Sequence, residues 1–170
     1  RQMCIRDSTK VEERLPVKIK GIPGGQTSGT AMISANCEAF ESYGLSASLI
    51  SPVCRDCGEA FANSANFMIR SDHHHLRVGP TIYMFWTKEK SGFTPASYFS
   101  QPTDEDVQRL MESYRTGQAV SDVQAEGLYA LSLSASGGRV VVRDWLETTV
   151  PKAQTNLGRW FALQRLVGFD

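Results

Sequence analysis

The sequence predicts an α+β fold, with a mainly antiparallel sheet that contains a β-hairpin and is covered by about three helices. Two alternating apolar segments flank Ser136-Gly137-Gly138, as in a β-hairpin. Apolar residues recur at helical spacing after residue 54, after residue 104 and over 151–167. Together with shorter alternating segments, these patterns give the order β-β-α-β-α-β-β-α.

In the first half of the chain we expect two strands and one helix. Residues 17–22 alternate apolar and basic side chains, and a second strand is expected over 31–34, after a turn-rich loop at 21–30. The helix is expected to begin near 52–54 and to end before the histidines at 73–75. Its apolar face is predicted to carry Phe61, Ala65, Met68 and Ile69.

In the second half we expect a single strand within 76–88 and then a loop over 90–103. Thr103 or Asp104 is predicted to cap a helix that ends at Gly117. The hairpin follows, with strands near 129–133 and 140–145. Pro151 is expected at the start of the last helix. Two apolar stripes support these helices: Val107, Leu110, Met111 and Tyr114 in one, and Ala153, Leu157, Trp160, Phe161 and Val167 in the other.

Length, charge and cysteine content restrict the class of protein. The 170 residues suit one domain or a piece of a longer chain, and 18 basic residues balance 18 acidic ones. This balance excludes a strongly basic polyanion-coated protein but allows a local basic face. No apolar run is long enough to span a membrane. Four cysteines are too few for a disulfide scaffold, so we expect a reduced, cytoplasmic setting.

Both ends of the sequence suggest a partial chain. Residues 1–8 resemble translated sequencing-adapter sequence and are expected to be non-native. Residues 9–170 are then an interior α+β segment, and so a partial domain of a larger protein.

Cys54 and Cys57 form a CxxC motif, which supplies two ligands of a structural zinc site. Cys37 or the histidines at 73–75 are candidates to complete it. Zinc is therefore an alternative for this chain, as a structural or interaction module. The other interpretation is a helix start with two reduced thiols, without any cofactor.

The three histidines of the sequence, His73, His74 and His75, are its only imidazole candidates for a general base. A histidine-dependent hydrolase would need one of them beside a carboxylate or nucleophile. The sequence contains no serine elbow and no HExxH motif, so we expect no enzyme and no catalytic residue.

A set of basic and polar side chains could contact nucleic acid or a neighbouring subunit. They lie on the first predicted strand, in the glycine-rich loop, on the predicted strand within 76–88 and on the hairpin's return strand. They are Lys18, Lys20, Gln26, Thr27, Arg77, Arg139 and Arg143. The alternative interpretations are a plain turn for the loop and solvated charges for the arginines.

Collinear segments from about residue 14 onward go beyond these motifs. They are Pro16–Gln26 with Ser28-Gly29-Thr30, Ala39–Gly44, Ala60–Asn63 with Asn66, Val78-Gly79, Phe85–Thr87, Leu128–Ser134, Arg139–Trp145, Thr148, Val150, and Asn156 with Arg159–Phe161. In this order they resemble the large subunit of subtype I-C CRISPR effector complexes, the Csd-type (Cas8c) Cascade large subunit. The CxxC motif and the histidine triplet depart from that pattern.

The resemblance implies a non-catalytic role in RNA-guided DNA binding. Guide RNA reads the target in such complexes, while protein recognises a short flanking motif and holds the opened DNA. The implied partners are the other Cascade subunits, target double-stranded DNA and the helicase–nuclease of the system. Chains of this family are several times longer, which again implies an internal segment.

Overall fold

The computed structural model describes residues 11–35, 37–41, 43–88, 93–100, 102–116 and 127–164. The chain divides into two compact units, which we describe separately. The first unit comprises Arg1–Met84 and Ser132–Asp144, and the second comprises Phe85–Leu131 and Trp145–Asp170.

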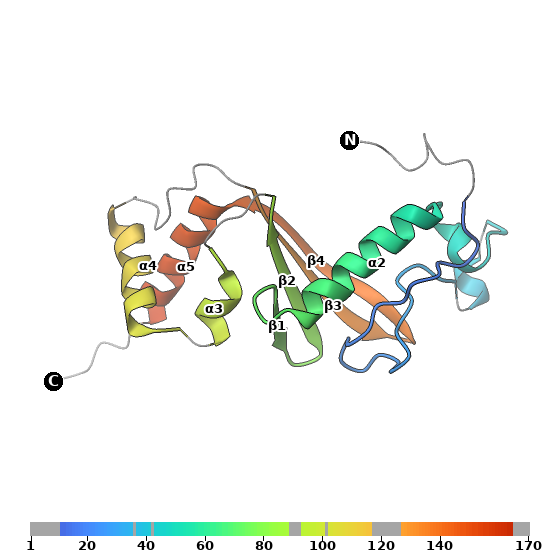
Figure 1. The fold of residues 1–170 in the computed structure, drawn as a ribbon, viewed down its shortest axis with the longest axis horizontal. Helices are drawn as coiled ribbons and strands as arrows, with labels where there is room; N and C mark the ends of the chain where they lie inside the picture. The colour runs from blue at the N-terminus through green and yellow to red at the C-terminus, as the bar shows by residue number, and fades with distance from the viewer. Residues whose placement is uncertain are drawn as a thin grey trace. The chain divides into compact units, whose positions relative to one another are not determined.

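A four-stranded antiparallel sheet confirms the predicted α+β class (Figure 1). Its order is β1 (His75–Val78), β2 (Thr81–Thr87), β3 (Gly127–Ser136) and β4 (Arg139–Thr149). The predicted hairpin is β3–β4, and it turns at Gly137 and Gly138, which have φ values of 56° and 78°. Two successive residues with positive φ give the turn that matches the twist of a hairpin, which explains the glycine pair.

The single strand predicted within 76–88 is wrong, because the structure divides this segment into β1 and β2. They pair in register from His75↔Met84 to Val78↔Thr81. The chain reverses at Gly79, whose φ is 55°, and Pro80 follows. Gly-Pro is a turn signal that the continuous apolar run concealed.

The predicted first helix is α2 (Arg55–Arg70), which begins after Cys54 as expected. Its buried residues are Gly58, Ala62, Ala65 and Ile69, so the buried face lies slightly around the helix from the predicted one. Small residues dominate this face because the chain before the helix approaches closely. A Cβ on Gly58 would clash with a methyl carbon of Leu15.

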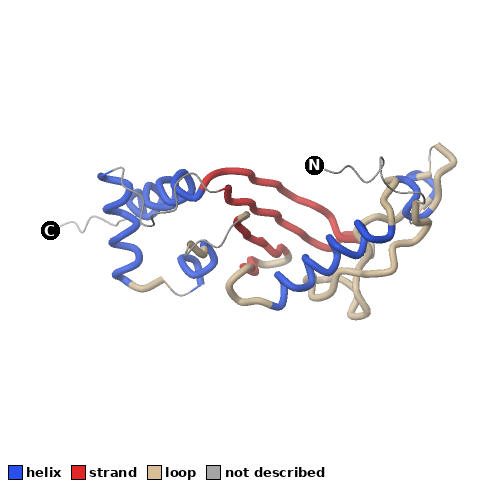
Figure 2. The backbone as a smooth tube through the Cα atoms, turned by 45° about the horizontal axis from the view of Figure 1, so that its top comes forward, coloured by secondary structure: helices blue, strands red, loops and turns tan. Residues whose placement is uncertain are grey.

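The two strands predicted over 17–22 and 31–34 are each reduced to isolated bridges. Ile19 pairs with Thr30, and Ala31 pairs with Arg139. Loops fill most of the described chain before α2, with short 3₁₀ helices at Glu38–Phe40 (η1) and Ala47–Ile50 (η2) (Figure 2). The glycines between 21 and 29 turn the backbone too often for a longer ladder to form.

The second unit holds α3 (Pro95–Ser100), α4 (Asp104–Thr116) and α5 (Val150–Gln164). The loop predicted over 90–103 is therefore wrong where α3 forms. The Thr103 cap is confirmed, because its hydroxyl accepts a hydrogen bond from the Asp106 N–H at 3.2 Å. The start of the last helix near Pro151 is also confirmed.

The core of the second unit joins α5 to the sheet. Phe93, Leu128 and Val150 are buried together, with Tyr98, Ala153 and Leu157 packed against them. Helices α4 and α5 pack against each other, and Leu110 of α4 is fully buried. The predicted helix end at Gly117 and the predicted contact of Val167 lie outside the described residues. None of the helices described here is long and apolar enough to cross a membrane.

Candidate nucleic-acid interface

Lys18 and Lys20 lie on an extended segment whose backbone is hydrogen-bonded on both edges. On one edge Ile19 exchanges two backbone hydrogen bonds with Thr30, at 3.0 and 2.7 Å. On the other edge the Asn66 amide accepts from the Lys20 N–H at 2.8 Å and donates to the Lys18 carbonyl at 3.0 Å. Successive side chains of an extended strand alternate in direction. Ile19 is 1% exposed, whereas both lysines are exposed.

The glycine-rich loop returns the chain from Ile19 to Thr30. Gly29 has a φ of 102°, and a Cβ there would lie 2.7 Å from the Cβ of Lys18. The loop tip is closed by the Gln26 N–H, which donates to the Thr30 hydroxyl at 3.0 Å. Gln26 and Thr27 are both exposed at this tip. The loop is thus the turn that the alternative interpretation expected, and it also presents the predicted contact residues.

Arg77 joins this segment from β1. Its guanidinium donates a hydrogen bond to the Gly21 carbonyl at 3.2 Å, and its side chain is exposed. Arg70 lies one helical turn after Asn66 on α2 and is also exposed. We call Lys18, Lys20, Arg70 and Arg77 the basic cluster.

Two members of this arrangement were not predicted from sequence as site residues. Arg70 and Asn66 are both polar residues in the last two turns of a helix, which is ordinarily a solvated position. Their spacing of four residues was the available signal that they share a helix face. Only the fold shows that this face meets the segment that carries Lys18 and Lys20.

The charges of the basic cluster are not neutralised within the described part of the chain. None of its four members has a carboxylate oxygen within ion-pair distance there. The ion pair formed among the described residues joins Arg55 and Glu59 at 2.9 Å. The hydrogen bond that the Arg55 guanidinium donates to the Glu59 carboxylate raises the pKa of Arg55. The cluster therefore leaves its positive charge available to an external anion.

Arg139 and Arg143 differ in their surroundings. Arg139 is half-buried, donates to the Ser34 carbonyl at 2.9 Å and lies 4.1 Å over the ring of Phe40. This geometry favours a structural role for Arg139, which ties the segment before α2 to β4. Arg143 is exposed and donates from Nε to the Ser134 hydroxyl at 2.7 Å. Contact between Arg143 and a partner stays a prediction.

The CxxC motif lies at the start of α2. Cys54 is the N-cap residue, and its Sγ accepts a hydrogen bond from the Cys57 N–H at 3.4 Å. Cys57 is disulfide-bonded, so the interpretation with two reduced thiols is wrong for Cys57. A disulfide sulfur is also not the thiolate that zinc requires. No three His, Cys, Asp or Glu side chains of the described chain are grouped for a metal ion. Zinc binding stays a hypothesis, and the geometry favours helix capping for Cys54.

His73 and His74 lie in the turn between α2 and β1, and His75 is the first residue of β1. His73 is exposed, whereas His74 and His75 are half-buried. The imidazole Nδ1 of His75 lies 2.9 Å from the Ser71 carbonyl oxygen, and the ring of His74 lies 6.2 Å from that of Phe67. These contacts are local to the turn, which is the arrangement of a helix-to-strand connection.

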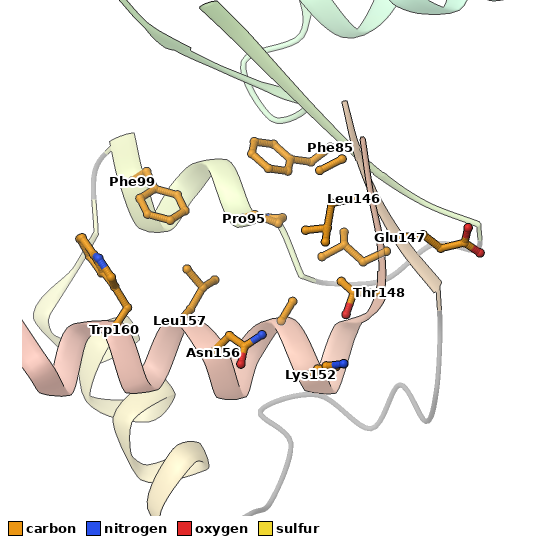
Figure 3. A pocket seen from close by; sticks show the side chains of 13 residues that line it. Phe85, Pro95, Phe99, Leu146, Glu147, Thr148, Lys152, Asn156, Leu157 and Trp160 are labelled. Carbon is orange, nitrogen blue, oxygen red and sulfur yellow. The ribbon is translucent and has the colours of Figure 1, made fainter. Parts of the chain in front are cut away.

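A mainly apolar pocket of about 420 Å³ lies in the second unit (Figure 3). Phe99 of α3 and Leu157 and Trp160 of α5 line one side of it. Glu147, Thr148, Lys152 and Asn156 are its polar lining residues. The apolar majority of this lining suits contact with an apolar group.

Residues 3–168 match the family model described as CRISPR-associated protein (Cas_Csd1). The chain belongs to the CRISPR-associated Csd1 family. This match covers nearly the whole chain and includes the basic cluster, and it confirms the resemblance to a Csd1-type Cascade subunit. A search of curated proteins found none that matches the chain. The Csd1 match begins at residue 3, and residues 3–8 lie outside the described structure, so their non-native origin stays a prediction.

Proposed function

We propose that this Csd1-family chain is a non-catalytic, nucleic-acid-binding segment of the large subunit of a type I-C CRISPR surveillance complex. The observation that carries the proposal is the pair Lys18 and Lys20, exposed on one face of a segment fixed at both edges. Guide RNA supplies sequence recognition in complexes of this kind, and protein cations hold the nucleic-acid backbone.

The geometry of the basic cluster supports phosphate binding rather than base reading. Residues two apart on a strand are separated by roughly 6.6 Å, so the two ammonium groups address neighbouring positions along a charged backbone. Hydrogen bonds on both edges already fix the backbone that bears the two lysines, and this lowers the entropic cost of binding. Each lysine acts here as a point charge. Arg70 on α2 and Arg77 on β1 add two further exposed cations.

The finer roles belong to the parent subunit and rest on family membership. We propose that it supports flanking-motif recognition, the opening of target DNA and recruitment of the helicase–nuclease, in the cytoplasm. We also propose that it performs these roles without catalysis of its own.

The test is the salt dependence of target-duplex binding by the full-length parent assembled with guide RNA. Lys18→Ala/Lys20→Ala should lower the slope of log K against log salt by about two, and affinity at 0.15 M by roughly 30-fold. Lys88→Ala/Lys152→Ala removes the same charge from two exposed lysines of the second unit and should leave the slope unchanged. Equal slopes for the two double variants would remove the basis of the proposal.

A further inference from the structure

The segment around the first 3₁₀ helix exposes more apolar surface than a solvated loop needs. Tyr43 is 92% exposed, and Phe40 and Leu45 are exposed by 47% and 43%. Single exposed apolar residues are ordinary, but neighbouring ones mark interaction sites. We call Glu38, Phe40, Glu41, Tyr43 and Leu45 the aromatic–acidic patch.

Local hydrogen bonds hold the backbone of this patch in place. The Glu41 N–H donates to the Glu38 carbonyl, and the Gly44 N–H donates to the Glu41 carbonyl, both at 2.9 Å. The φ of 69° at Gly44 makes the turn that follows Tyr43. Arg139 supports the ring of Phe40 from one side at 4.1 Å. The exposed side chains therefore stand on an ordered base, as in a preorganised binding surface.

Charge separates this surface from the basic cluster. The sequence contains no Lys or Arg between residues 21 and 54. Glu38 and Glu41 lie in this stretch and give the patch two negative charges. The cation nearest to Phe40, Arg139, donates its hydrogen bond to the Ser34 carbonyl. Acidic side chains repel phosphates and attract a cationic rim, so this surface selects against nucleic acid.

We propose that the aromatic–acidic patch is a docking surface for a protein subunit whose apolar contact area is rimmed by Lys and Arg. Tyr43 is the central anchor, because an exposed tyrosine combines large apolar area with few rotatable bonds. The carboxylates of Glu38 and Glu41 pair with the partner's rim and set its orientation. The first unit would then bind nucleic acid through the basic cluster and protein through the patch.

The choice of partner for the test rests on the proposed function, which places the parent chain in a Cascade complex. The probe is the set of other protein subunits of that complex, purified with guide RNA, and the full-length parent is titrated against it. Tyr43→Ser/Leu45→Ser should weaken this association roughly tenfold or more. Phe67→Ser, on α2 of the same unit and 66% exposed, should remain within about twofold of wild type.

A second variant tests the charge argument. Glu38→Lys/Glu41→Lys should also weaken subunit association, and its binding of free duplex should stay the same or rise. Thermal unfolding of each variant should stay close to wild type, because Glu38, Tyr43 and Leu45 are exposed and Glu41 is half-buried on the surface.

Three results would overturn the proposal. One is wild-type subunit association by Tyr43→Ser/Leu45→Ser. Another is a loss of duplex binding by that variant with subunit association intact, which would make the patch a nucleic-acid surface. A wild-type parent that binds none of the subunits would overturn both this proposal and the Cascade assembly, whereas the nucleic-acid role fails separately, through the lysine variants.

Discussion

The backbone N–H of Lys20 donates a hydrogen bond to the side-chain oxygen of Asn66 at 2.8 Å, although 46 residues separate them. The same amide donates to the carbonyl of Lys18, so Asn66 pairs with this segment much as a neighbouring strand would. The segment Lys18–Lys20 is therefore hydrogen-bonded to the Asn66 side chain on one edge. On its other edge it forms the single backbone bridge between Ile19 and Thr30. The position of the two lysines depends on α2.

Replacement of Asn66 should therefore destabilise the chain without touching a charge. Asn66→Ala removes two hydrogen bonds and should lower the free energy of unfolding by about 1–2 kcal/mol. Asn63→Ala, at an exposed position one turn earlier, is the control for the gain in helix propensity and should be neutral or slightly stabilising. Urea unfolding measures both. Similar unfolding midpoints for the two variants would show that the Asn66 bonds contribute nothing.

Arg139 should not tolerate lysine. Arg139→Lys keeps the charge but loses the guanidinium's planar contact with Phe40 and its hydrogen bond to Ser34, and should cost about 1–3 kcal/mol. Arg143→Lys, at an exposed position on the same strand, should cost about 0–1 kcal/mol. Thermal unfolding compares them at equal net charge. A larger loss at Arg143 would contradict the structural role of Arg139.

Cys54 should be replaceable by serine. Serine is a better N-cap than cysteine, so Cys54→Ser should leave stability unchanged or raised by a few tenths of a kcal/mol. Cys54→Ala should instead lose about 0.5–1 kcal/mol. Cys37→Ser, at an exposed cysteine outside the motif, is the control.

Elemental analysis distinguishes this capping role from zinc binding. Less than about a tenth of an equivalent of zinc, and no change in unfolding after chelation, are expected for a cap. Stoichiometric zinc that disappears in Cys54→Ser would instead establish the metal site.

Tyr98 should make the second unit sensitive to alkaline pH. Burial against the core raises the pKa of its phenol, and Asp106 adds to this shift. The neutral phenol is therefore favoured in the folded state. The contribution of the Tyr98 phenol to the free energy of unfolding is fully present below about pH 10, the pKa of a tyrosine in the unfolded chain. This contribution is lost as the pH rises through the higher pKa of Tyr98 in the folded chain.

Tyr98→Phe supplies the matched comparison, because it removes the titrating hydroxyl and keeps the ring beside Phe93. Wild type should lose stability above about pH 10 more steeply than the variant in urea unfolding at several pH values. Parallel curves for the two proteins would show that Tyr98 ionises freely in the folded chain.

Local patterns were sufficient for much of the fold. The Ser-Gly-Gly turn between β3 and β4, the Thr103 cap and the start of α5 at Val150 all depend on residues close in sequence. The predictions that were wrong concern weaker local preferences. The turn at Gly79-Pro80 was hidden in an apolar run, and α3 formed in a segment rich in turn residues, where packing overrode propensity.

The sequence by itself determined the fold class, the family and the polar candidates Lys18, Lys20, Gln26 and Thr27, because these depend on composition and on order along the chain. Only the tertiary structure decided which candidates meet. It placed the Asn66 side chain against the segment that carries the two lysines, gave Arg139 a structural place over the ring of Phe40, and left Tyr43 exposed with Phe40 and Leu45. The physical reason is that these relations depend on contacts between residues tens of positions apart, which no local periodicity encodes.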